Sequence, residues 1–246
     1  MALKASPQEQ ALLLDLQALD TKLQQLAHRS KNLPEHAVLQ TLAAEAAVLA
    51  RTQAEQAGAR EDAQLELSRI ESDVAVVEAR IARDAGRLQT TSSVKDVQAL
   101  EQEIAALRKR LNDLEEIELT VMERVEAQNA VVASADSELA AVREKIAAIE
   151  VDRDAGLRVV EAERNNAAAN RSTIAAKIPA DVLALYEKQR ARYGTGASHL
   201  RGGVSSASGV KLNENDMVAI RAAAPDDVLL CPDSSAILVR TAESGL

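Results

Sequence analysis

The chain has 246 residues, a length that corresponds to one or two domains. It contains no Phe and no Trp, and its only aromatic residues are Tyr186 and Tyr193. Aromatic side chains usually dominate the cores of globular proteins. About one residue in five is Ala and 27% are charged, which is typical of long helices or coiled coils. The composition therefore argues against a standard α/β enzyme.

The charge is unevenly distributed along the chain. Residues 1–177 contain 22 Lys or Arg and 30 Asp or Glu, and the whole chain has a formal net charge of −9. An acidic body disfavours general binding to a phosphate backbone, which needs a basic face. The sequence shows no signal peptide and no apolar run long enough for a membrane span, and Cys231 is the only cysteine. We therefore expect a cytoplasmic protein with no intrachain disulfide and no membrane segment.

The first predicted helix begins at Ser6 and Pro7. Ser6 and Glu9 have the spacing of a capping box, and Pro7 suits the first helical position. Leucines then follow at alternating spacings of four and three residues, which places them on one coiled-coil stripe: Leu12, Leu16, Leu19, Leu23 and Leu26. The pattern stops at residues 32–34, where Pro34 can begin the next helix.

Two longer helices follow, because no proline occurs between residues 35 and 178. One heptad frame runs from Leu39 to Leu88, and a second runs from Val97 to Ile174. Residues 90–93 are Thr-Thr-Ser-Ser, which favours a turn. The segments on either side of this turn, residues 6–89 and 94–177, have equal lengths. Residues 1–177 are thus predicted to form an antiparallel coiled-coil hairpin in which residue i faces roughly residue 184 − i. Dimerisation of such hairpins is left open.

The expected pairing of residue i with residue 184 − i places two weakly packed regions in the hairpin. Gln56 faces Gln128, and this polar pair either sets the register of the helices or marks solvated slack in a thin core. The helix break near residues 32–34 faces residues 152–156, so the sequence predicts a bend or hinge at that height.

Residues 178–246 are predicted to form a linker helix and a small α+β module. Pro179 begins the helix, which ends before Gly194. A hairpin is expected over 204–212, a helix capped by Asn213 up to about 223, and strands over 228–231 and 236–240. The expected core is apolar and includes part of the linker helix: Val204, Val210, Leu212, Met217, Val218, Ile220, Val228, Leu230, Ile237 and Val239.

Three segments carry a family resemblance: SSVKDVQALE at 92–101, IPADVLALYEKQRARYG at 178–194 and PDDVLLCPDSSAILVR at 225–240. They resemble the hairpin tip, helix and ribbon of bacterial coiled-coil proteins with a C-terminal C4-type zinc ribbon, a family long labelled as of unknown function. The resemblance covers the whole chain. It implies a mainly α fold, with a long helical hairpin followed by a small zinc-ribbon-like module.

The resemblance also identifies four metal-ligand positions, and this chain departs from the family there. The family has two Cys-x-x-Cys knuckles, whereas the corresponding residues here are Ser205, Ser208, Cys231 and Ser234. Structural zinc needs four thiolate or imidazole ligands. We therefore expect a degenerate ribbon that binds no zinc and no other cofactor.

The sequence bears on three functional classes, namely enzymes, protein-interaction scaffolds and nucleic-acid-binding proteins. The sequence contains no catalytic spacing and no phosphate-binding glycine loop, so we expect no enzyme. A protein-interaction adaptor or chaperone-like scaffold, contacting partners through the hairpin and the head, fits best, and relatives in the family are tied to flagellar and secretion partners. The alternative is nucleic-acid binding, a role also linked to relatives, through a basic segment with two tyrosines available for stacking: Tyr186, Lys188, Arg190, Arg192, Tyr193, His199 and Arg201.

Overall fold

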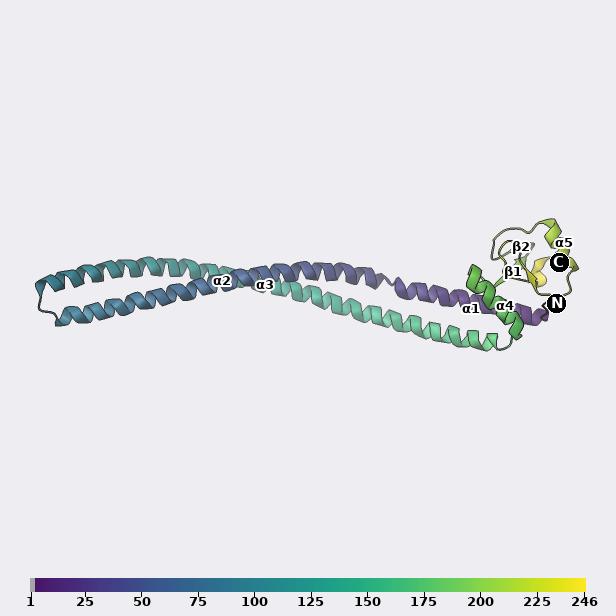
Figure 1. The fold of residues 1–246 in the computed structure, drawn as a ribbon, viewed down its shortest axis with the longest axis horizontal. Helices are drawn as coiled ribbons and strands as arrows, with labels where there is room; N and C mark the ends of the chain where they lie inside the picture. The colour runs from purple at the N-terminus through teal and green to yellow at the C-terminus, as the bar shows by residue number, and fades with distance from the viewer. Residues whose placement is uncertain (1–2) are drawn as a thin grey trace. The chain divides into compact units, whose positions relative to one another are not determined.

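A computed structural model describes residues 3–246 (Figure 1). The chain forms three long or medium helices, α1 (Pro7–Lys31), α2 (Pro34–Thr90) and α3 (Val94–Ala175), followed by α4 (Ala180–Tyr193). The remaining elements are β1 (Ala197–Arg201), β2 (Val204–Ser205), α5 (Glu214–Ala222), β3 (Leu229–Leu230), β4 (Ile237–Val239) and the 3-10 helix η1 (Ala242–Ser244). The mainly helical fold with a helical hairpin, predicted from the sequence, is confirmed. Within residues 3–246, none of the helices has the length and apolarity of a membrane span.

The chain divides into two compact units. The hairpin unit is Glu35–Val151, and the head unit combines Met1–Pro34 with Asp152–Leu246. The head unit therefore contains α1, the last part of α3 and everything that follows it.

The hairpin unit follows the predicted heptads. On α2 its buried residues are spaced by seven, at Ala63, Ile70, Val77 and Asp84. Every buried residue of α3 in this unit also lies on the predicted stripe: Leu100, Ile104, Leu107, Val121, Val132, Leu139 and Val142. Ion pairs Arg80–Glu103 and Glu66–Arg124 link the two helices, within two turns of the predicted register. An antiparallel pair of helices that shares one apolar seam explains this burial pattern.

The expected helix break is present between α1 and α2 and has no counterpart in α3. The α1 helix ends at Lys31, where the Asn32 side chain donates to the carbonyl of His28, and α2 begins at Pro34. The α3 helix continues without interruption through residues 152–156. Gly156 lies against the side chain of Leu33, which is buried. The predicted break near residues 32–34 is thus present, whereas α3 stays helical opposite it, where Gly156 makes room for Leu33.

The head unit is built around a four-stranded sheet with the order β2-β1-β4-β3. Strands β1 and β4 pair in parallel, and the two outer pairs are antiparallel. One face packs on α1 and α4 through Ala197, Ile237 and Val239, and the other packs on α5 through Leu200 and Leu238. The alternation of β4 side chains between two covered faces explains why all three of its residues are buried.

The sequence predicted most of the head elements, with two corrections. Strand β1 was not expected, and it pairs through Gly202 and Gly203 with β2. Three residues of the expected core are exposed, namely Val210 (54%), Val218 (56%) and Leu230 (46%). The helix capped by Asn213 and the two strands β3 and β4 are confirmed, and the structure pairs these strands antiparallel.

Candidate functional site

A buried carboxylate lies where α1, α3 and α4 meet. Asp20 is 3% exposed. Arg171 donates to both of its oxygens, at 2.6 Å from Nε and 3.1 Å from Nη2, and the hydroxyl of Tyr186 donates at 2.7 Å. Burial opposes ionisation of Asp20, but the bonds from Arg171 and Tyr186 outweigh it and hold the pKa of this carboxyl below its ordinary value.

Glu187 extends this network along α4. It accepts from Arg171, and Arg190 donates to it at 2.7 Å. Burial raises the pKa of Glu187, but the two guanidinium groups lower it further, so the net shift is downward. Burial and the bond to Asp20 raise the pKa of Tyr186. Each charge in this cluster has a counter-charge, which is the arrangement of a structural clamp and not of a group poised to exchange protons near pH 7.

Gln17 connects α1 to the start of the sheet. Its Oε1 accepts from the backbone N–H of Gly196 at 2.7 Å and from that of Ala197 at 3.3 Å. A Cβ atom at Gly196 would lie 2.5 Å from the Tyr186 ring and 2.8 Å from the Tyr186 carbonyl oxygen. Only glycine fits this approach, so position 196 sets how closely the sheet packs on α4.

Most of the predicted basic contact segment is already paired. Arg190 bonds to Glu187, and Arg201 forms an ion pair with Glu243 at 2.7 Å. The ring of His199 bonds to the Thr241 hydroxyl at 2.7 Å. The two arginines compensate local carboxylates, so they do not combine with their neighbours into one basic face.

The two tyrosines have opposite environments. Tyr186 is 0% exposed and cannot stack on a base, whereas Tyr193 is 47% exposed with Arg192 over its ring at 5.2 Å. Lys188 is also exposed. The proposed role of Tyr186 as a stacking residue is therefore corrected, because its ring completes the apolar core between α1, α4 and the sheet.

The four positions identified as ligand equivalents lie in two matching turns. In the first, Ser205 N–H donates to the Val210 carbonyl, Gly209 N–H to the Ser205 carbonyl, and Val210 N–H to the Ser208 hydroxyl. In the second, the same three bonds link Cys231 to Ala236, Ser235 to Cys231, and Ala236 to the Ser234 hydroxyl. Gly209 and Ser235 both have a left-handed backbone, with φ of 70° and 57°.

These turns offer a poor ligand set for a metal. Metal ligands bind in deprotonated form, and serine hydroxyls do not ionise near neutral pH. Among residues 3–246, no group of three His, Cys, Asp or Glu side chains could hold a metal ion. The residues present therefore do not fit the zinc that the family resemblance implies.

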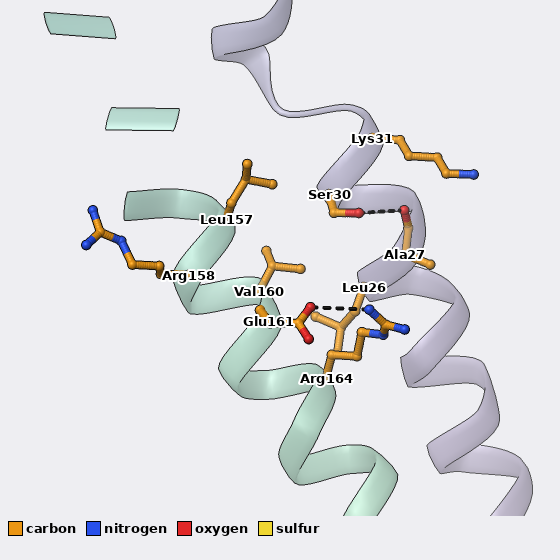
Figure 2. A pocket seen from close by; sticks show the side chains of 9 residues that line it. All are labelled: Leu26, Ala27, Ser30, Lys31, Leu157, Arg158, Val160, Glu161 and Arg164. Carbon is orange, nitrogen blue, oxygen red and sulfur yellow. Dashed lines mark hydrogen bonds and ion pairs between the residues drawn. The ribbon is translucent and has the colours of Figure 1, made fainter. Parts of the chain in front are cut away.

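A groove runs between α1 and α3 within the head unit (Figure 2). It has a volume of about 630 Å³, and its base is formed by the buried side chains of Leu26 and Val160 with Leu157 beside them. Arg164 pairs with Glu161 across one edge at 3.2 Å, and the side chains of Lys31 and Arg158 extend outward from the rim. The groove is thus an apolar trough with charged edges, a surface suited to a third helix.

Sequence reasoning missed a second buried face on α1, formed by Gln10, Leu13 and Asp20. The side chain of Gln10 donates to the carbonyl oxygens of Ala5 and Pro225 at 2.9 and 3.2 Å. The run Leu12-Leu13-Leu14 is the signal that could have found this face, because it makes the helix apolar on more than one side.

Comparisons with known proteins identify a family, relatives and similar solved structures. A model of the CT398-like coiled coil hairpin domain family matches residues 16–194. An uncharacterised protein of Mycobacterium tuberculosis strain H37Rv is 33% identical over 97% of this chain and 98% of its own length. A solved structure from Mycobacterium smegmatis has a TM-score of 0.88 at 33% identity, covering 97% of this chain and all of that one. CT398 from Chlamydia trachomatis has a TM-score of 0.65 at 18% identity, covering 94% and 97%, and supports the fold alone.

Proposed function

Because the chain belongs to the CT398-like coiled coil hairpin domain family, we propose that it is a non-enzymatic interaction scaffold that binds protein partners through its helical hairpin and its head. Within the described residues 3–246, no catalytic constellation supports another class, since the charged cluster around Asp20 is fully compensated. The proposal includes no cofactor.

The groove between α1 and α3 is the observation that carries this proposal. Two helices alone cover only part of each other, so an apolar trough stays open along their line of contact. Leu26, Leu157 and Val160 supply an apolar base, and charges of both signs lie along its edges. This pattern matches a helix-in-groove mode, in which the partner presents apolar residues at helical spacing.

Nucleic-acid binding is the alternative, supported by the exposed residues Lys188, Arg192 and Tyr193 near the end of α4. Three residues form a small site, and Arg190 and Arg201 are engaged with carboxylates. Because affinity for a phosphate backbone depends on the number of free cations, we favour the protein-interaction proposal.

Photo-crosslinking in cells tests the proposal. A photoreactive amino acid at Ala27, which is exposed and lines the groove, is compared with one at Val159, which is 53% exposed and outside the groove lining. We expect position 27 to capture defined protein partners that persist after nuclease treatment and in high salt. A Leu157→Asp substitution is expected to abolish this capture, because it places a charge on the apolar base.

Two outcomes and one control decide between protein interaction and nucleic-acid binding. Equal capture at positions 27 and 159 would show that the groove selects no partner. Loss of every crosslink after nuclease would favour the nucleic-acid alternative. Tyrosine fluorescence of the Leu157→Asp protein verifies that the head unit stays folded, since Tyr186 and Tyr193 both belong to that unit.

A further inference from the structure

The two turns at Ser205–Val210 and Cys231–Ala236 repeat one another in burial as well as in hydrogen bonding. The first residue of each turn is buried, with Ser205 at 0% and Cys231 at 1% exposure. The fourth residue of each, Ser208 or Ser234, is half-buried, and the two residues between are exposed in both turns. Each turn therefore buries its first residue and partly buries its fourth, with the same backbone geometry.

Three of these four side chains, those of Ser205, Cys231 and Ser234, lie together. The hydroxyls of Ser205 and Ser234 both lie beside the sulfur of Cys231, so the two turns meet at this sulfur. Ser205 Oγ also lies 2.7 Å from Ser198 Oγ, and Ser198 in turn accepts from the backbone N–H of Ala207 at 3.1 Å. The polar groups at this point therefore satisfy one another within the protein.

We propose that this hydroxyl–thiol cluster joins the two turns without a metal, and that the turns keep a backbone able to hold one if thiols replace the hydroxyls. The first part follows from the ligand chemistry, because three of the four groups at these positions are hydroxyls and are already engaged in hydrogen bonds. The second follows from the matched turns, which share three hydrogen bonds and a left-handed residue at the fifth position.

The test compares the wild-type chain with the triple variant S205C/S208C/S234C, both produced with zinc in the medium. We expect no zinc in the wild-type chain and one zinc per chain in the variant, measured by elemental analysis after gel filtration. A chelator is expected to lower the thermal midpoint of the variant, followed by tyrosine fluorescence, and to leave that of the wild-type chain unchanged.

A matched control moves one thiol to the exposed second position of the first turn, as S205C/S206C/S234C. The cobalt-loaded control should lack the tetrahedral four-thiolate absorption that we expect from the first variant. Stoichiometric zinc in the wild-type chain, or a folded S205C/S208C/S234C chain without zinc, would overturn the proposal.

A single substitution keeps the proposal testable if the triple variant does not fold. Ser205→Ala removes the hydroxyl bond to Ser198 and the contact with the Cys231 sulfur, so the tyrosine-monitored midpoint should fall by the same amount with and without chelator. An unchanged midpoint would show that the cluster does not join the turns.

Discussion

The hairpin unit and the head unit bury their side chains in different ways. In the head unit Leu13, Val182 and Tyr186 are 0% exposed, whereas the most buried apolar side chain of the hairpin unit, Val121, is 3% exposed. The head unit packs helices on both faces of a sheet, and the hairpin unit packs one helix on another. A two-helix seam leaves each side chain close to solvent, so it accommodates Leu, Val, Ile and Ala and has no interior for a large aromatic ring.

Buried polar groups show the same contrast. In the part of the chain that the structure describes, the buried side-chain atoms without a hydrogen-bond partner all lie in the hairpin unit: Glu35 Oε2, Arg60 Nε, Asp84 Oδ2 and Gln128 Oε1. In the head unit the buried groups of Gln10, Asp20, Ser198 and Ser205 are bonded. The head unit draws partners from several elements, while a helix in the hairpin unit faces only one neighbour.

The largest expected difference comes from equivalent truncations in the two units. Leu13→Ala should destabilise the head unit by about 4 kcal/mol, and Ile70→Ala should destabilise the hairpin unit by about 2 kcal/mol. Leu13 is 0% exposed and Ile70 is 8% exposed, so the head cavity is more enclosed. Tyrosine fluorescence reports the head unit, and far-ultraviolet circular dichroism reports mostly the long helices. Equal losses in the two variants would contradict the proposed contrast in packing.

Glycine-to-alanine substitutions should have opposite signs in the two units. Gly196→Ala should cost about 3 kcal/mol, because its Cβ would lie 2.5 Å from the Tyr186 ring, with backbone at 2.8 Å. Gly58→Ala should stabilise α2 by about 0.5 to 1 kcal/mol, because nothing lies within 4 Å of its added Cβ and alanine favours the helix. Urea unfolding measures both changes. A stabilised Gly196→Ala protein would show that Gly196 does not lie this close to Tyr186 on α4.

The contrast between the units also explains what sequence reasoning could reach. The seam at Ile70 and Val77 repeats every seven residues, so a local pattern predicts it. The clamp at Asp20 joins Arg171, 151 residues away, and Gln17 reaches Gly196, 179 residues away. No periodicity links such positions, and a polar residue on an apolar helix face does not identify its partner. The pairing of β1 with β4 was missed for the same reason, because β1 is a short segment that becomes a strand only beside β4.

Acid should weaken the head unit before the hairpin unit. The pKa values of Asp20 and Glu187 are lowered in the folded chain, so the stability that their ionised forms contribute is complete above the unfolded pKa values of about 4. This contribution is lost as the pH falls through the lower, folded pKa values. Below pH 5, the unfolding midpoint followed by tyrosine fluorescence should therefore fall by more than the midpoint followed by far-ultraviolet circular dichroism.

Two substitutions isolate the source of this acid sensitivity. Asp20→Asn should flatten the pH dependence of the head unit and lower its stability at pH 7, because Arg171 loses its buried counter-charge. Asp15→Asn changes an exposed residue on the same helix and should leave the profile as it is in the wild-type chain. A profile that stays steep in Asp20→Asn would assign the sensitivity to other carboxylates.

The smallest effect is expected at the polar level of the hairpin unit. Gln128 Oε1 is buried without a partner, so Gln128→Leu should stabilise the hairpin unit by about 1 kcal/mol, while Asn129→Leu at the exposed neighbouring position should change it by less than about 0.5 kcal/mol. The distance between spin labels on α2 and α3 then distinguishes whether Gln128 sets the register of the helices or marks solvated slack. An unchanged label distance in Gln128→Leu indicates solvated slack, whereas a broadened distance distribution indicates that Gln128 sets the register at a cost in stability. A destabilised Gln128→Leu protein with a sharp distance would contradict both, because it would require a hydrogen bond at Oε1.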